Sequence, residues 1–100
     1  MPNWVSRVEA ILDLLNRYHV RASYGAVAGH VGVRNVRTYM DRFPREPRYS
    51  WVVSGEPPHE PSGYPAEARH PHLTRHRMVL TDKRELTAWM RRKLAGAPLP

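Results

Sequence analysis

The chain has 100 residues, of which 41% are hydrophobic and 25% are charged, and ten of them are prolines. This length suits a single domain, and the absence of cysteine excludes a disulfide framework, a cysteine-ligated zinc site and a cysteine nucleophile. Sixteen Lys and Arg against nine Asp and Glu give a net charge of +7, which favours an anionic partner.

The positive charge is concentrated in two blocks. Residues 17–48 hold seven Arg against two acidic side chains, and residues 69–93 hold eight basic side chains against two acidic ones. The segment 49–68 between them carries acidic charge only. Two basic blocks separated by an acidic loop are typical of a nucleic-acid-binding face rather than of a uniform compositional bias.

No targeting or membrane-spanning segment is recognisable. No basic stretch followed by an apolar one opens the sequence, and no run approaches the roughly 20 apolar residues that span a bilayer. We therefore expect a cytoplasmic protein without a membrane partner.

The first predicted element is an amphipathic helix over residues 3–18. Trp4, Val8, Ile11 and Leu15 recur at helical spacing, and we expect this stripe to face the core.

The segment 23–42 has the pattern of a helix-turn-helix. Ser23 is a suitable N-cap for a short helix over 24–31, Gly32 favours a left-handed end, and a second short helix is expected from about 34 to 42. Small residues that would let these two helices cross closely are Gly25, Ala28 and Gly29.

The second of these helices would present side chains suited to phosphates and base edges. They are Arg34, Asn35, Arg37, Thr38 and Arg42. The alternative is a structural helical hairpin with a solvated basic face.

Residues 50–54 are expected to form a short strand. Residues 77–80 form either a second strand, which would make a small β-hairpin with the first, or the close of a helical turn. Between them, 55–71 is a Pro-rich loop, and long loops of this kind are functional or disordered.

A C-terminal helix is predicted over residues 82–95. Thr81 or Asp82 would cap it, with Asp82 and Glu85 at the spacing of a capping box, and Gly96 would end it. The fold class expected is mainly α: a winged helix-turn-helix-like single domain over 1–96 with a small β-hairpin, an extra C-terminal helix and a frayed tail over 97–100.

Metal and catalytic motifs are absent from the sequence. His70, His72 and His76 cluster, but no HExxH motif and no acidic residue at ligand spacing accompany them, so we expect surface or phosphate-contacting histidines and neither metal nor cofactor. The serines lack a nucleophile elbow, the acids are scattered, and no Gly-rich phosphate loop occurs. We therefore expect no enzymatic activity.

The order of several motifs resembles a known DNA-binding domain. "ASYGAVAGHVG", "VRNVRTYM", "PRYSWVVSGE", "PSGY" and "HPHLTRHRMVL" follow one another as in the alkylguanine-DNA alkyltransferases and the non-enzymatic alkyltransferase-like proteins, over about residues 8–80. The resemblance implies that Tyr24 contacts DNA at a flipped nucleotide and that Arg34 or Arg37 fills the vacated stack, by way of the minor groove. Ser54 would also belong to the contact face, helped by Arg69, Arg75 and Arg77.

Aligned on its Val-Val pair, the chain departs from the family at the reactive positions. Tyr49 takes the place of the reactive cysteine, Ser50 that of the histidine and Trp51 that of the arginine, and these three form a candidate base pocket that they either line or fill. Without a thiolate, alkyl transfer to the protein is chemically unavailable. The resemblance thus implies a non-covalent binder of double-stranded DNA that recognises alkylated bases in repair.

Three other functions remain open from the sequence. The chain could be a winged-helix transcription regulator, or a protein-interaction module whose partner binds the loop 55–71. The third is an enzyme acting on nucleic acid through His70, His72 or His76.

Overall fold

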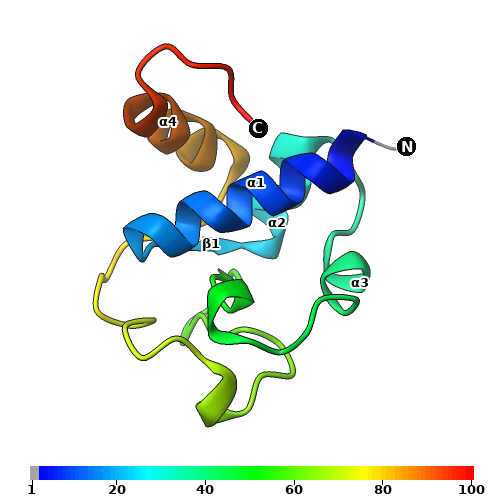
Figure 1. Cartoon of the computed structure of the whole chain (residues 1–100), viewed down its shortest axis with the longest axis vertical. Helices are drawn as coiled ribbons and strands as arrows, with labels where there is room; N and C mark the ends of the chain where they lie inside the picture. The colour runs from blue at the N-terminus through cyan, green and yellow to red at the C-terminus, as the bar shows by residue number, and fades with distance from the viewer. Residues whose placement is uncertain (1–2) are drawn as a thin grey trace.

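The computed structural model describes residues 3–100, with side chains from Trp4 onward. These residues form four α-helices and three short strands, and none of the helices combines the length and apolar character needed to cross a membrane. In chain order the elements are α1 (Asn3–Tyr18), β1 (Arg21–Ser23), α2 (Tyr24–Val31), α3 (Arg37–Met40), the 3-10 turn η1 (Pro47–Tyr49), β2 (Val52–Val53), the 3-10 turn η2 (Ala66–Ala68), β3 (Val79–Leu80) and α4 (Lys83–Leu94). Helix α1 crosses the molecule, with α4 on one side of it and α3 on the other (Figure 1).

Helix α1 matches its predicted bounds and supplies much of the core. Val8, Ile11 and Leu15 are completely buried, as their helical spacing predicts. The core also contains Trp51 and Trp89, the largest side chains that are excluded from solvent.

Helix α2 also begins and ends as predicted. The hydroxyl of Ser23 accepts a hydrogen bond from the amide of Ala26 at 3.0 Å, and Gly32 adopts a left-handed φ of 87°. Gly29, however, makes room for α4 rather than for α3. A Cβ atom at Gly29 would lie 3.2 Å from the Cβ of Lys83, so a larger residue would push the two helices apart.

Helix α3 is shorter than the predicted helix over 34–42. The side chain of Asn35 accepts a hydrogen bond from the amide of Arg37 at 2.9 Å, which starts the helix at Arg37 and leaves Arg34 in the preceding turn. An Asn side chain competes with the helix for backbone amides in this way, so it favours a turn over a helix interior.

The sheet is parallel, and the predicted β-hairpin is wrong. Strand β1 lies in the centre and pairs in parallel with both β2 and β3, with Ala22 opposite Val52 on one side and Leu80 on the other. A hairpin requires antiparallel neighbours, whereas parallel strands need long connections, and the segments before β2 and β3 supply them. Strand β1 has only three residues and no apolar alternation, so the sequence pattern did not reveal it.

The buried Arg21 of β1 ties the two long connections to the sheet. Its guanidinium donates to the main-chain oxygens of His59 and His76, each at 3.2 Å. A buried guanidinium needs such acceptors, because an unpaired buried charge is strongly destabilising. The loop 55–71 and the segment before β3 are therefore anchored to the centre of the fold.

Helix α4 is capped by Asp82, whose carboxylate accepts from the amide of Glu85 at 2.9 Å. The carboxylate of Glu85 accepts from the amide and hydroxyl of Thr81, both at 2.8 Å, so both predicted cap residues take part. After Gly96 the chain returns to α1, where Arg7 donates to the main-chain oxygen of Pro100 and Leu99 packs against the core.

The interface between α2 and α4 contains a histidine whose surroundings favour its neutral form. His30 Nδ1 lies 2.7 Å from the hydroxyl of Thr87, while its Nε2 is buried without a hydrogen-bond partner among residues 3–100. Burial lowers the pKa of His30, and the positive charges of Arg7, Lys83 and Arg91 lower it further.

This histidine predicts a loss of stability in mild acid. Because the pKa of His30 is lower in the folded protein than in the unfolded chain, its contribution is complete above about pH 6.5 and is lost as the pH falls. We expect the free energy of unfolding of His30→Gln to fall less than that of the wild type between about pH 7.5 and about pH 5, measured by urea denaturation. His76→Gln, whose side chain is exposed, is the control and should follow the wild type.

Candidate nucleic-acid interface

Most of the residues predicted to contact DNA line two clefts that share Asn35. The first has a volume of about 280 Å3 and lies between α2 and the turn before α3. The second, of about 190 Å3, lies between α3 and the start of α1. The first is lined by Tyr24, Gly25, Ala28, Arg34, Asn35, Val36 and Arg37, and the second by Trp4, Asn35, Thr38, Tyr39 and Arg42.

Gly25 leaves open space at the first cleft. A Cβ atom there would find only the hydroxyl oxygen of Ser23, at 3.9 Å, so packing within the protein does not require a glycine. A glycine inside a helix costs about 1 kcal/mol relative to alanine. Its presence leaves the helix backbone open to close approach by another molecule.

Four tyrosines of the described chain lie beneath an arginine; one of them is Tyr18, under Arg17 at the end of α1, and the other three lie near the first cleft. The distances from the arginine Cζ to the ring centroid are 4.7 Å for Arg37 over Tyr24, 4.6 Å for Arg48 over Tyr49, and 5.3 Å for Arg45 over Tyr64. Guanidinium groups stack on aromatic faces at such distances. We call these six residues the Arg–Tyr patch.

The three tyrosines of this patch lie close to one another. The hydroxyl of Tyr24 accepts a hydrogen bond from the amide of Ser62 at 3.0 Å, two residues before Tyr64. Burial raises the pKa of Tyr64 to about 12; Arg45 opposes the rise, and Tyr24 and Tyr49 are among the groups that add to it.

The hydroxyl of Tyr64 is an unsatisfied polar group. It is buried and has no hydrogen-bond partner within the part of the chain that the structure describes. A buried hydroxyl without a partner costs about 1–3 kcal/mol, so the described residues leave the hydrogen-bonding capacity of Tyr64 unused at this position. Tyr64, Arg45 and Arg48 were not among the predicted site residues, although the "PSGY" motif contains the first of them.

The residues of the candidate base pocket differ in their burial and do not line one cavity. Tyr49 is half-buried and stacks on Phe43, with ring centroids 4.9 Å apart. Ser50 is fully buried; its hydroxyl donates to the main-chain oxygen of Pro47 at 2.6 Å and accepts from the amide of His70 at 3.0 Å. Only Tyr49 therefore belongs to the patch.

Trp51 is also completely buried, and a hydrogen bond from its indole nitrogen fixes it in the core. Trp51 Nε1 donates to the side-chain oxygen of Asn16 at 2.8 Å. The indole ring stacks on the imidazole of His19, with centroids 5.3 Å apart and an interplanar angle of 5°. Trp51 fills space in the core, and a base would have to displace it.

Ser54 lies at the base of the loop 55–71 and not in either cleft. Its hydroxyl accepts from the amide of Glu56 at 3.3 Å, and its amide donates to the main-chain oxygen of Glu60 at 3.0 Å. Arg69 is engaged with the same loop, since it donates to the main-chain oxygen of Tyr64 and pairs with Glu60 at 3.3 Å. The other two arginines that were predicted to assist the contact face, Arg75 and Arg77, are exposed.

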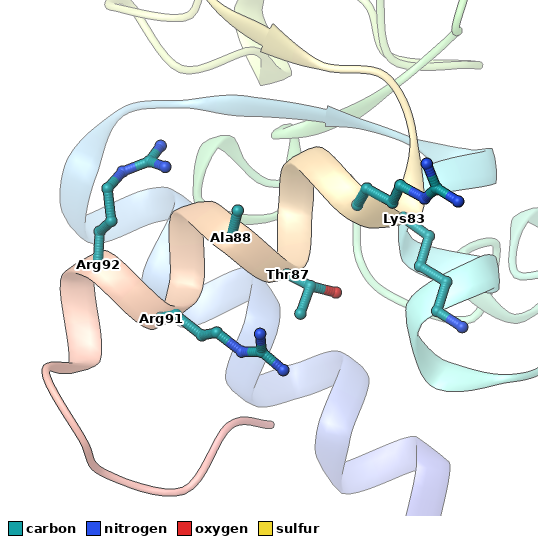
Figure 2. Close-up of a pocket in the computed structure, with 6 residues that line it drawn as sticks. Lys83, Thr87, Ala88, Arg91 and Arg92 are labelled. Carbon is teal, nitrogen blue, oxygen red and sulfur yellow. The ribbon is translucent and has the colours of Figure 1, made fainter.

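A second basic surface lies on α4. Lys83, Arg84, Arg91 and Arg92 surround Thr87 and Ala88 in a shallow groove of about 430 Å3 (Figure 2). This groove shares no lining residue with the Arg–Tyr patch, and α3, which carries Arg37 of the patch, lies on the other side of α1 from α4 (Figure 1).

Comparisons of the chain with protein-family models, with curated proteins and with solved structures find no match. The resemblance to alkyltransferase-like proteins therefore stays a prediction from motifs. The sheet brings two of those motifs together, because Ser23 of "ASYG" pairs with Val53 of "WVVSG" across β1 and β2.

The contact between Trp51 and Asn16 is open to a direct test. Replacing Asn16 by Leu would leave the buried indole N–H without an acceptor, and we expect the free energy of unfolding to fall by about 1–3 kcal/mol in urea denaturation. Asn16→Asp keeps an acceptor oxygen and should lose less. Wild-type stability in Asn16→Leu would mean that the indole reaches water and that Trp51 is not fixed in the core.

Proposed function

We propose that this protein binds double-stranded DNA non-covalently, in the manner of an alkyltransferase-like protein and without enzymatic activity. The Arg–Tyr patch, beside a cleft lined by Arg34 and Arg37, is the observation that carries the proposal.

The chemistry of the patch suits both parts of a nucleotide. Planar guanidinium groups bind phosphate oxygens through two parallel hydrogen bonds. Tyrosine faces stack on bases, which is a sequence-tolerant interaction. A base that stacks on Tyr24 would displace Arg37 from the ring, and the freed guanidinium would then be available to enter the vacated base stack.

The position of Arg37 distinguishes it from Arg34. Both line the first cleft, but Arg37 lies 4.7 Å over the ring of Tyr24, the residue that the resemblance places at the flipped nucleotide. Arg37 is therefore our choice for the arginine that replaces the extruded base. Base extrusion through the minor groove uses an inserted side chain of this kind.

Two features support binding over catalysis. The sequence contains no cysteine, so no thiolate can accept an alkyl group. Ser50 stands where the family has its histidine, and its hydroxyl is buried and donates to the main-chain oxygen of Pro47. No activated nucleophile follows from this arrangement.

The length of α3 bears on the alternative of a transcription regulator. With four residues, α3 is about 6 Å long, which presents few side chains to the major groove. Regulators with a helix-turn-helix read bases through the recognition helix and bind as dimers with two half-sites. The short α3 supports recognition of backbone and of an extruded base instead.

The affinity for DNA should fall with salt concentration, and it should depend on the residues of the Arg–Tyr patch more than on the net charge of the protein. We expect the affinity for a short duplex, measured by fluorescence anisotropy, to fall steeply with salt. Arg37→Ala should weaken binding by about 1–3 kcal/mol, and Tyr24→Ala should weaken it without changing the salt slope. Arg92→Ala removes the same charge from α4 and is the matched control.

Two results would count against this location of the interface. Undetectable binding at about 50 mM salt would remove DNA as the partner. Equal losses for Arg37→Ala and Arg92→Ala would show that the chain binds through diffuse charge.

The lesion preference separates a damage sensor from a regulator. We expect a duplex with one alkylguanine to bind about tenfold more tightly than the same duplex with guanine, a difference of about 1.4 kcal/mol. Equal affinity for the two duplexes, together with a strong dependence on base sequence and a dimeric mass in light scattering, would indicate a regulator.

A further inference from the structure

Three histidines from distant parts of the chain meet beside Trp51. His19 follows α1, while His70 and His72 lie in the segment after η2, and one ring nitrogen of each lies within 4.8 Å of the other two. Their ring centroids are 4.6, 5.2 and 5.4 Å apart. His76, which is close to His70 and His72 in the sequence, is exposed and does not belong to this cluster.

Two of the three imidazoles are held in place by the core. His19 adopts a left-handed φ of 57°, an uncommon conformation for a residue other than glycine, and its ring stacks on the buried indole of Trp51. The amide of His70 donates to the buried hydroxyl of Ser50, and its ring lies 4.8 Å from that of Trp51. The core therefore orients both rings before any ligand arrives.

The third imidazole has a nitrogen without a partner. His72 Nδ1 is buried and makes no hydrogen bond to any of residues 3–100. A buried imidazole nitrogen normally has a donor, an acceptor or a metal ion beside it.

We propose that His19, His70 and His72 form a binding site for a transition-metal ion, with Zn2+ as the ion that three neutral imidazoles suit best. The proposal is independent of DNA binding.

Zinc–nitrogen bonds of about 2.0–2.1 Å place the nitrogens of tetrahedral ligands about 3.3 Å apart, so the ring nitrogens of the cluster must approach one another by up to about 1.5 Å. His72, the ring that the core does not hold, would rotate toward His19 and His70, and water would complete the coordination.

Metal binding would change one hydrogen bond in the cluster. His70 Nδ1 accepts from the amide of His72 at 3.0 Å. A metal ion at Nδ1 of His70 would replace this bond, and one at Nε2 would move the ring proton to Nδ1 and break it. One hydrogen bond is a small loss beside three metal–nitrogen bonds.

The test uses tag-free protein treated with chelator and titrated with ZnCl2 by calorimetry. We expect saturable binding of one ion per chain, a higher Tm on adding Zn2+, and a tetrahedral visible spectrum when Co2+ is used instead. His72→Gln and His19→Asn should each lower the affinity at least about tenfold. Asn at position 19 tolerates the left-handed φ, which protects the fold.

His76→Gln and His59→Gln are the matched controls and should bind Zn2+ as the wild type does, because neither residue belongs to the cluster. The proposal is overturned if the wild type shows no saturable binding at one equivalent and no Co2+ spectrum, a result that does not depend on any variant folding. It is equally overturned if folded His72→Gln keeps wild-type affinity, or if His76→Gln loses as much affinity as His72→Gln.

Discussion

The parallel pairing of β1 on both of its edges is the constraint on which the rest of the structure depends. Ala22 lies opposite Val52 on one side and Leu80 on the other, so one residue joins segments that are far apart in the chain. Ser23 adds to this role, because its hydroxyl caps α2 and also donates to the main-chain oxygen of Thr81 at 3.1 Å. The positions of α2, of the strand β2 and of the start of α4 are thereby set together.

Residues 49–51, directly before β2, contact both proposed sites. Tyr49 lies in the Arg–Tyr patch beneath Arg48, while Trp51, two residues later, stacks on His19 of the histidine cluster. Ser50 lies between them and accepts from the amide of His70. Three consecutive residues, of which Ser50 and Trp51 are buried, therefore contact both proposed sites.

Local chemistry explains why the helices were predictable and why α3 and the sheet were not. Ser23, Gly32 and Asp82 act on backbone groups a few residues away, so their effect is readable from spacing alone. The start of α3 depended on whether the side chain of Asn35 would take the amide of Arg37, a choice between two local hydrogen bonds that spacing does not settle. The direction of β3 depended on its pairing with β1. In that pairing Val79 lies opposite Arg21, which is 58 residues earlier in the chain.

The sequence by itself determined the mainly helical class, the bounds of α1 and α2, the basic charge and the absence of a thiol acceptor. The predicted DNA-contact residues Tyr24, Arg34 and Arg37 were also near one another in the chain, and the structure places them around one cleft. Only the tertiary structure decided that Tyr64 joins Tyr24, and that His19 joins His70 and His72. These groupings depend on how β1 pairs with distant segments, and periodicity and spacing carry information only about residues within a few turns of one another.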